Sequence, residues 1–158
     1  MKIKTIAAGI LFAGIAVAGP ASAQPSTSAE PNYGTLTLRG GFTPDPRVVS
    51  VQAGGNLEAS SAARNCQGFI SSAPDVRLNF TPGRRPLIIS VASGTDTTLV
   101  VNAPDGRWYC DDDGGVNGSN PQVRFNRAQR GSYEIWVGTF SSGNAQPARL
   151  HISEVRSQ

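Results

Sequence analysis

The stretch DTTLVVNAPDGRWYCDDDGG, residues 96–115, contains two strand patterns, a turn between them and an acidic loop after them. Residues 97–101 are β-branched or apolar, and residues 107–110 form a short aromatic run. The Ala-Pro-Asp-Gly sequence at 103–106 has strong turn chemistry. The order predicts a β-hairpin, and we expect the rest of the fold to be built around it.

The expected register of this hairpin follows from a loop of four residues, 103–106. Antiparallel pairing then places Val101 opposite Trp108 and Leu99 opposite Cys110. Cross-strand partners share one face of a sheet, so we expect these four side chains to point together into the core.

The first 23 residues have the pattern of a secretory signal peptide. Lys2 and Lys4 supply a positive start, residues 6–17 an apolar stretch, and residues 21–23 the Ala-Ser-Ala pattern of a cleavage site before Gln24. We therefore expect export, either to a periplasm or to the extracellular medium. The apolar stretch is too short for an ordinary membrane span, so we expect none in the mature chain.

The remaining residues predict a linker followed by one domain. Residues 24–32 are rich in Pro and Ser and predict a disordered linker, whereas residues 33–158 suffice for a single hydrophobic core. Removal of the signal peptide also removes both lysines, which leaves 12 of the 14 basic residues, all arginine, against 11 acidic ones. This nearly even charge, with no basic run beyond Arg84-Arg85, is not typical of a nucleic-acid-binding protein.

The two cysteines, Cys66 and Cys110, are expected to form a disulfide in an exported chain. The alternative is a reactive or metal-binding thiol pair. Neither a CxxC spacing nor a nearby histidine supports that alternative.

The chain from residue 33 onward alternates short strand patterns with Gly, Pro and Asn turns, and no apolar spacing of three and four residues is sustained. It predicts an all-β fold, a two-sheet antiparallel β-sandwich with jelly-roll-like connections. The expected strands cover residues 35–39, 48–52, 66–70, 75–80, 87–92, 97–101, 107–110, 122–125, 131–138 and 148–155.

Four motifs, in this order, resemble the bacterial pre-peptidase C-terminal domain family, whose members are small secreted β-sandwiches usually appended to exported proteases. The motifs are Asp96–Val101, Ala103–Gly106, Asp111–Asp113 and Gly131–Val137, and the resemblance covers residues 48–154. It implies a jelly-roll-like sandwich, a non-catalytic accessory or binding role and, in some members, calcium.

Calcium is the sharpest chemical hypothesis, because it takes six to eight oxygen ligands in a tolerant geometry. The adjacent carboxylates of Asp111, Asp112 and Asp113 diverge in an extended segment, so Asp96, Asn117 and loop carbonyls would complete the shell. The expected register brings Asp96 beside Asp113. The alternative is a solvated acidic turn, and the EF-hand pattern does not match.

A secreted hydrolase of the serine peptidase kind is the catalytic alternative. His151 is the only histidine, and its strand pattern places it on the outward side of the last strand. No Gly-x-Ser-x-Gly sequence occurs, and the acidic triplet lies in a turn and not in a cleft. The sequence therefore supports this alternative poorly.

Binding of a carbohydrate, another cell-surface polymer or a protein is the remaining alternative. Alternation places Trp136 outward on its strand, and the expected hairpin register places Tyr109 outward as well. Together they would form an aromatic platform for a sugar ring or a peptide. Single exposed aromatic residues also occur by chance or at covering loops.

Overall fold

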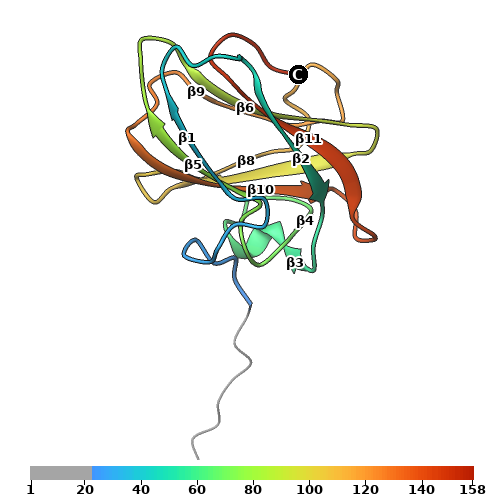
Figure 1. Ribbon diagram of the computed structural model, residues 1–158. Helices are drawn as coiled ribbons and strands as arrows, with labels where there is room; N and C mark the ends of the chain where they lie inside the picture. The colour runs from blue at the N-terminus through green and yellow to red at the C-terminus, as the bar shows by residue number, and fades with distance from the viewer. Residues whose placement is uncertain (1–22) are drawn as a thin grey trace, which may run out of the picture.

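Two β-sheets packed face to face make up the part of the chain that the computed structural model describes, residues 23–158 (Figure 1). The signal peptide expected over residues 1–23 lies outside the described residues apart from Ala23. Within the described residues, no helix is long and apolar enough to cross a membrane.

The strands follow the expected patterns closely, so the all-β prediction is confirmed. One 3-10 turn, η1 (Ala59–Ser61), interrupts them. The strands are β1 (Thr35–Arg39), β2 (Arg47–Ala53), β3 (Leu57–Glu58), β4 (Phe69–Ile70), β5 (Val76–Thr81), β6 (Leu87–Ser93), β7 (Thr97–Asn102), β8 (Trp108–Asp111), β9 (Gln122–Phe125), β10 (Gly131–Thr139) and β11 (Gln146–Ser153).

The connections follow the expected jelly-roll order. One sheet has the order β2-β11-β6-β9, and the other contains β5-β10-β7-β8, with β1 beside β5 and the β3–β4 pair beside β10. From β5 onward the chain crosses between the sheets at every connection except the β7–β8 hairpin. One detail differs from the antiparallel expectation, because β1 pairs with β5 in parallel.

Inward-facing side chains of both sheets form the main core between them. Phe125 of β9 packs edge-on against Tyr109 and Tyr133, with ring centroids 4.9 and 5.1 Å apart. Full burial of each large apolar side chain contributes about 1.5–3 kcal/mol relative to an exposed one. The fully buried members include Leu78, Leu87, Ile89, Val91, Leu99, Val101, Ile135, Val137, Leu150 and Ile152.

The central hairpin forms, but its register differs from the expected one by a single residue. The structure pairs Val101 with Tyr109 and Val100 with Cys110, whereas we expected Val101 opposite Trp108. Because side chains alternate between faces, a shift of one residue turns a strand over relative to its partner. Tyr109 therefore packs against the main core, and Trp108 and Cys110 point to the opposite face.

The turn chemistry explains the shift. The backbone N–H of Arg107 donates to Asp105 Oδ1 at 3.0 Å, so Asp105 forms a local turn that keeps Arg107 in the loop. The loop therefore has five residues, and it is closed by a hydrogen bond of 2.9 Å from the Ala103 N–H to the Arg107 carbonyl. As a further consequence, Leu99 lies opposite Asp111 and not opposite Cys110.

A second, smaller core lies on the outer face of the seven-stranded sheet, beneath the segment of residues 57–70. The expected disulfide between Cys66 and Cys110 is confirmed, with their Cα atoms 5.3 Å apart, and it belongs to this second core rather than to the space between the sheets. Trp108 and Trp136 pack beside it with ring centroids 5.3 Å apart. The remaining members are Ala59, Ile70, Val100, Leu57, Ala62 and Ala63.

A glycine in β10 allows the covering segment to approach the sheet. A Cβ atom on Gly138 would collide with the carbonyl oxygen of Phe69 and with the side chain of Thr98. No larger residue fits between the strand and the covering segment at this position.

The N-terminal segment is tied to the seven-stranded sheet, so the expectation of a disordered linker over residues 24–32 is wrong. Its backbone N–H groups at Ser26 and Asn32 donate to the carbonyls of Ser72 and Pro74, both at 2.8 Å.

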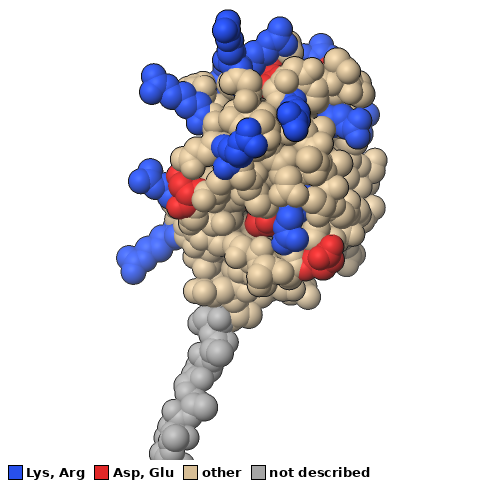
Figure 2. Space-filling view, turned by 60° about the vertical axis from the view of Figure 1, so that its left-hand side comes forward, with Lys and Arg blue, Asp and Glu red and all other residues tan. Residues whose placement is uncertain are grey.

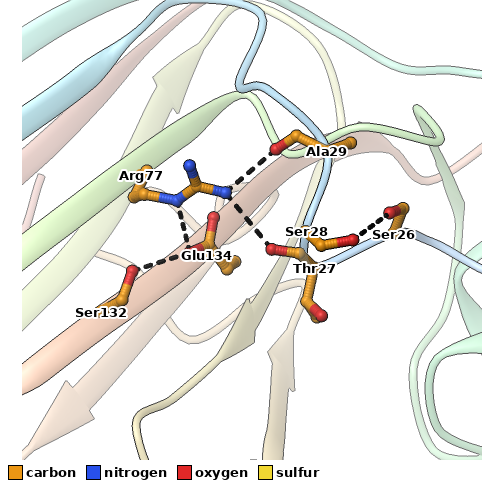
Figure 3. A network of polar contacts seen from close by, with 7 residues as sticks. All are labelled: Ser26, Thr27, Ser28, Ala29, Arg77, Ser132 and Glu134. Atoms are coloured by element: carbon orange, nitrogen blue, oxygen red, sulfur yellow. Dashed lines mark hydrogen bonds and ion pairs between the residues drawn. The ribbon is translucent and has the colours of Figure 1, made fainter.

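The side chain of Arg77 completes this attachment (Figure 3). Its Nη2 donates to the carbonyls of Ala29, at 3.0 Å, and Thr27, at 3.3 Å. Its Nε pairs with Glu134 Oε1 at 2.7 Å, an oxygen that also accepts the Ser132 hydroxyl. The pair is largely shielded from water, so it orients the guanidinium toward the segment.

Removal of the disulfide tests the energetic role of the second core. The variant with Cys66→Ser and Cys110→Ser should lose about 4 kcal/mol of unfolding free energy, because the disulfide closes a long loop in the unfolded chain. Urea denaturation followed by tryptophan fluorescence measures the loss. An unchanged denaturation midpoint would show that the covering segment is held by packing alone.

Candidate functional site

The acidic loop begins with Asp111, whose carboxylate accepts backbone hydrogen bonds within the fold. Asp111 Oδ2 accepts the backbone N–H groups of Gly114 and Gln122, both at 2.7 Å. The side chain thereby fixes the start of the β8–β9 loop and the beginning of β9. These two charge-assisted hydrogen bonds engage Oδ2, so within the described residues only Oδ1 of this carboxylate is without a hydrogen bond.

The other expected metal ligands do not gather around Asp111. Asp112 accepts a hydrogen bond of 3.3 Å from Gln67, and Asp113 is exposed in the loop beyond the last pair of the β7–β8 ladder. Asp96 is exposed before β7, and Asn117 accepts the Asn120 N–H through its carbonyl at 2.8 Å. Among residues 23–158, no three acidic, histidine or cysteine side chains form a group that could hold a metal ion. Calcium binding stays a prediction, and it would require the loop to rearrange.

The expected aromatic platform is wrong. Trp136 faces away from the main core as expected, but it is 0% exposed because the covering segment and Trp108 lie over it. Tyr109 points inward after the register shift, and its hydroxyl donates to Asp105 Oδ2 at 3.3 Å. Trp136 therefore presents no face to a ligand, and Tyr109 is only partly exposed.

His151 lies on the outward side of β11, as expected, but it is only 6% exposed. The chain after β11 returns over this face, where the Gln158 N–H donates to Ser90 Oγ at 3.1 Å and the Val116 N–H donates to the Gln158 carbonyl at 3.2 Å. Within the described residues, neither ring nitrogen has a hydrogen-bond partner. In the part of the chain that the structure describes, no carboxylate therefore orients the ring as a catalytic triad requires.

The pKa of His151 is lowered from its ordinary value of 6.5. Burial is the main cause, because it disfavours the charged imidazolium, and the positive charges of Arg149 and Arg156 act in the same direction. The neutral ring therefore fits its site better than the charged ring.

A groove of about 520 Å³ lies on the uncovered part of the outer face of the four-stranded sheet. Its floor is a cross-strand row of Ser50, Arg149 and Ala92 from β2, β11 and β6. Two small side chains in this row leave the space open. Tyr33 and Asn117 line the groove beyond the strands.

Tyr33 is held firmly at the groove. Its N–H donates to the Asp75 carbonyl, and its hydroxyl accepts the N–H of Gln52 on the edge strand β2, both at 2.8 Å. The residue as a whole is 40% exposed. Arg149 on the floor is also exposed, and within residues 23–158 its guanidinium forms no ion pair. The groove thus combines an aromatic face, a free cation and several hydroxyl and amide groups.

The buried carboxylate of Asp75, which sequence reasoning missed, helps to hold the segment that carries Tyr33. Asp75 Oδ2 accepts the Val137 N–H at 2.7 Å, and Oδ1 accepts a hydrogen bond of 3.2 Å from Asn32, the residue before Tyr33. Burial raises the pKa of Asp75 to about 6, although both hydrogen bonds lower it. In the sequence, Asp75 only marks the polar start of a strand, and nothing there indicates its partners.

Comparison of the chain with protein-family models finds no match, and comparison with curated proteins finds no significant one. The functional interpretation therefore depends on the site itself and on the order of the sequence motifs.

The pH dependence of stability tests the environment of His151. Because its pKa is lower in the folded than in the unfolded chain, its contribution to stability is complete above about pH 6.5 and is lost as the pH falls toward the folded pKa. Asp75 acts with the opposite sign, gaining stability as the pH falls through about 6.

The comparison of wild type with His151→Gln isolates the histidine, since Asp75 is present in both. Urea denaturation between about pH 7.5 and pH 5 should show a steeper loss of stability on acidification in the wild type. Parallel pH profiles would show that the ring is solvated in both protonation states.

Proposed function

We propose that this protein is an exported, non-catalytic accessory module that binds a surface polysaccharide. The groove on the outer face of the four-stranded sheet carries this proposal, because it places hydrogen-bonding groups around one exposed aromatic ring. The order of motifs that resembles pre-peptidase C-terminal domains supports the accessory role. The signal-peptide pattern and the disulfide support export.

The lining of the groove suits the hydroxyl groups of a sugar chain. Ser50, Gln52 and Asn117 offer donors and acceptors, and Tyr33 offers the flat apolar surface on which a sugar ring can pack. Arg149 supplies the only charged side chain among the lining residues. A protein partner would favour a larger apolar centre than one tyrosine provides.

The position of the groove also favours binding over catalysis. Its floor belongs to hydrogen-bonded strands and not to mobile loops, so its groups are held in place before a ligand arrives. His151, the only histidine, lies beneath the C-terminal segment and does not line the groove. The catalytic alternative therefore gains no support from this surface.

Binding measurements with defined polysaccharides test the proposal. We expect the protein to sediment with insoluble peptidoglycan or cellulose, and Tyr33→Ala to weaken this binding about two- to tenfold, as expected for the loss of ~0.5–1.5 kcal/mol of aromatic contact. Tyr33→Phe keeps the ring but loses the hydrogen bond from Gln52, so it should bind more tightly than Tyr33→Ala.

The matched control is Asn79→Ala, at an exposed position of β5 on the other sheet, and it should leave binding unchanged. Thermal melting of each variant separates a loss of binding from a loss of folding. Absence of sedimentation with either polysaccharide, or equal binding by Tyr33→Ala, would refute the assignment of the groove.

A further inference from the structure

Nine of the twelve arginines lie at one end of the sandwich, which we call the arginine end. At this end β1, β5, β7 and β9 finish, and β2, β6, β8 and β10 begin, so four connecting loops lie together. Eight of the nine are exposed, and Arg47 is half-buried. The nine are Arg39, Arg47, Arg84, Arg85, Arg107, Arg124, Arg127, Arg130 and Arg156.

The surface reflects this distribution. In Figure 2, basic side chains predominate over the upper part of the face shown and project from it, whereas acidic side chains are few there. Most carboxylates lie toward the opposite end of the sandwich, among them those of Asp96 and of the triplet Asp111–Asp113. The nearly even total charge is therefore the sum of two ends of opposite sign.

The acidic residues at the arginine end are engaged within the fold. The carboxylate of Asp45 accepts the hydroxyl of Ser153 and, at 3.0 Å, the N–H of Glu154. The carboxylate of Glu154 in turn accepts the N–H of Gly41. These two side chains hold the β1–β2 loop against the end of β11. They lower the net positive charge of this end, but within residues 23–158 neither forms an ion pair with an arginine.

The third acidic residue at this end, Asp105, neutralises one arginine at most. It pairs with Arg107, with an Nε to Oδ2 distance of 3.8 Å, and also accepts that residue's backbone N–H. Within residues 23–158, no other exposed arginine at this end forms an ion pair. Seven exposed guanidinium groups thus remain without an ion-pair partner among the described residues.

The chemistry of guanidinium groups indicates what would neutralise them. Each can form two parallel hydrogen bonds to a carboxylate or another oxyanion. Unpaired cations on neighbouring loops repel one another and together attract a polyanion, which gains affinity from several contacts at once. A polymer with acidic groups along its length fits this arrangement better than a single small anion.

The remaining surface chemistry distinguishes among polyanions. The exposed large hydrophobic residues include only Val48 and Val155 near this end, and no exposed aromatic residue. Inserted apolar residues strengthen binding to membrane surfaces, and aromatic stacking strengthens binding to single-stranded nucleic acid. The described residues contain no helix that could enter a duplex groove, only a 3-10 turn of three residues.

We propose that the arginine end is a second binding surface, separate from the groove, and that it takes a hydrophilic acidic polysaccharide through its carboxylate groups. The site extends over four loops and contains no deep pocket. Its affinity therefore comes from the number of simultaneous ion pairs and decreases with salt.

Titration with polygalacturonate, a carboxylate polysaccharide, tests this surface. The variant with Arg84→Gln, Arg85→Gln, Arg127→Gln and Arg130→Gln removes four exposed cations whose side chains form no hydrogen bond within the described residues. We expect its affinity to fall about tenfold or more at about 50 mM salt, and its dependence on salt to become weaker.

A control variant with Arg64→Glu, Asn56→Asp and Asn144→Asp carries the same net charge but changes exposed positions away from the arginine end. It should bind within about twofold of the wild type, because local contacts and not total charge determine binding. An equal loss of affinity in both variants would overturn the proposal.

Two further outcomes would also overturn it. One is tighter binding of the wild type to duplex DNA, or to vesicles containing phosphatidylserine, than to polygalacturonate at about 150 mM salt. The other is loss of polygalacturonate binding in Tyr33→Ala, which would place the acidic polymer in the groove. If Tyr33→Ala keeps polygalacturonate binding and the groove binds no neutral polysaccharide, the proposal for the groove fails and the proposal for the arginine end is supported.

Discussion

The pairing of Val100 with Cys110 is the constraint on which the rest of the structure depends. It directs Cys110 and Trp108 away from the main core, to the outer face of the seven-stranded sheet. There the disulfide between Cys110 and Cys66 holds residues 57–70 over the sheet. Strands β7 and β10 are consequently buried on both faces, and each exposes almost nothing. Because the other sheet is covered only in part, by the C-terminal segment, its remaining outer face is open and provides the groove.

The same topology separates the charges. Jelly-roll connections place alternate loops at opposite ends, and in this chain nine of the twelve arginines lie at one end. The carboxylates of Asp45 and Glu154 hold a loop in place and leave the arginines around them unpaired. The two proposed surfaces thus have different physical bases, hydrogen bonding around Tyr33 in the groove and charge at the arginine end.

Much of the fold can be predicted from the sequence, because alternation of apolar residues and turn chemistry act locally. The strands and the jelly-roll-like sandwich follow from such patterns, and the disulfide follows from the presence of two cysteines in a chain expected to be exported. The hairpin register could not be predicted, because it depends on whether Asp105 accepts the N–H of Arg107 and lengthens the loop by one residue. That one residue decides which side chains of β8 face the main core. The burial of Trp136 could not be predicted either, since a segment distant in sequence covers it. The arginine end could not be predicted from the net charge, because the fold brings together arginines that are distant in the sequence.

Measurement of cross-strand contacts in the β7–β8 hairpin by nuclear Overhauser effects tests the central claim most directly. We predict contacts between the main-chain protons of Val100 and Cys110 and between those of Asn102 and Trp108. Contacts that join Leu99 with Cys110 and Val101 with Trp108 instead would place the disulfide between the sheets. That result would contradict the second core and the two-sided burial of the central strands.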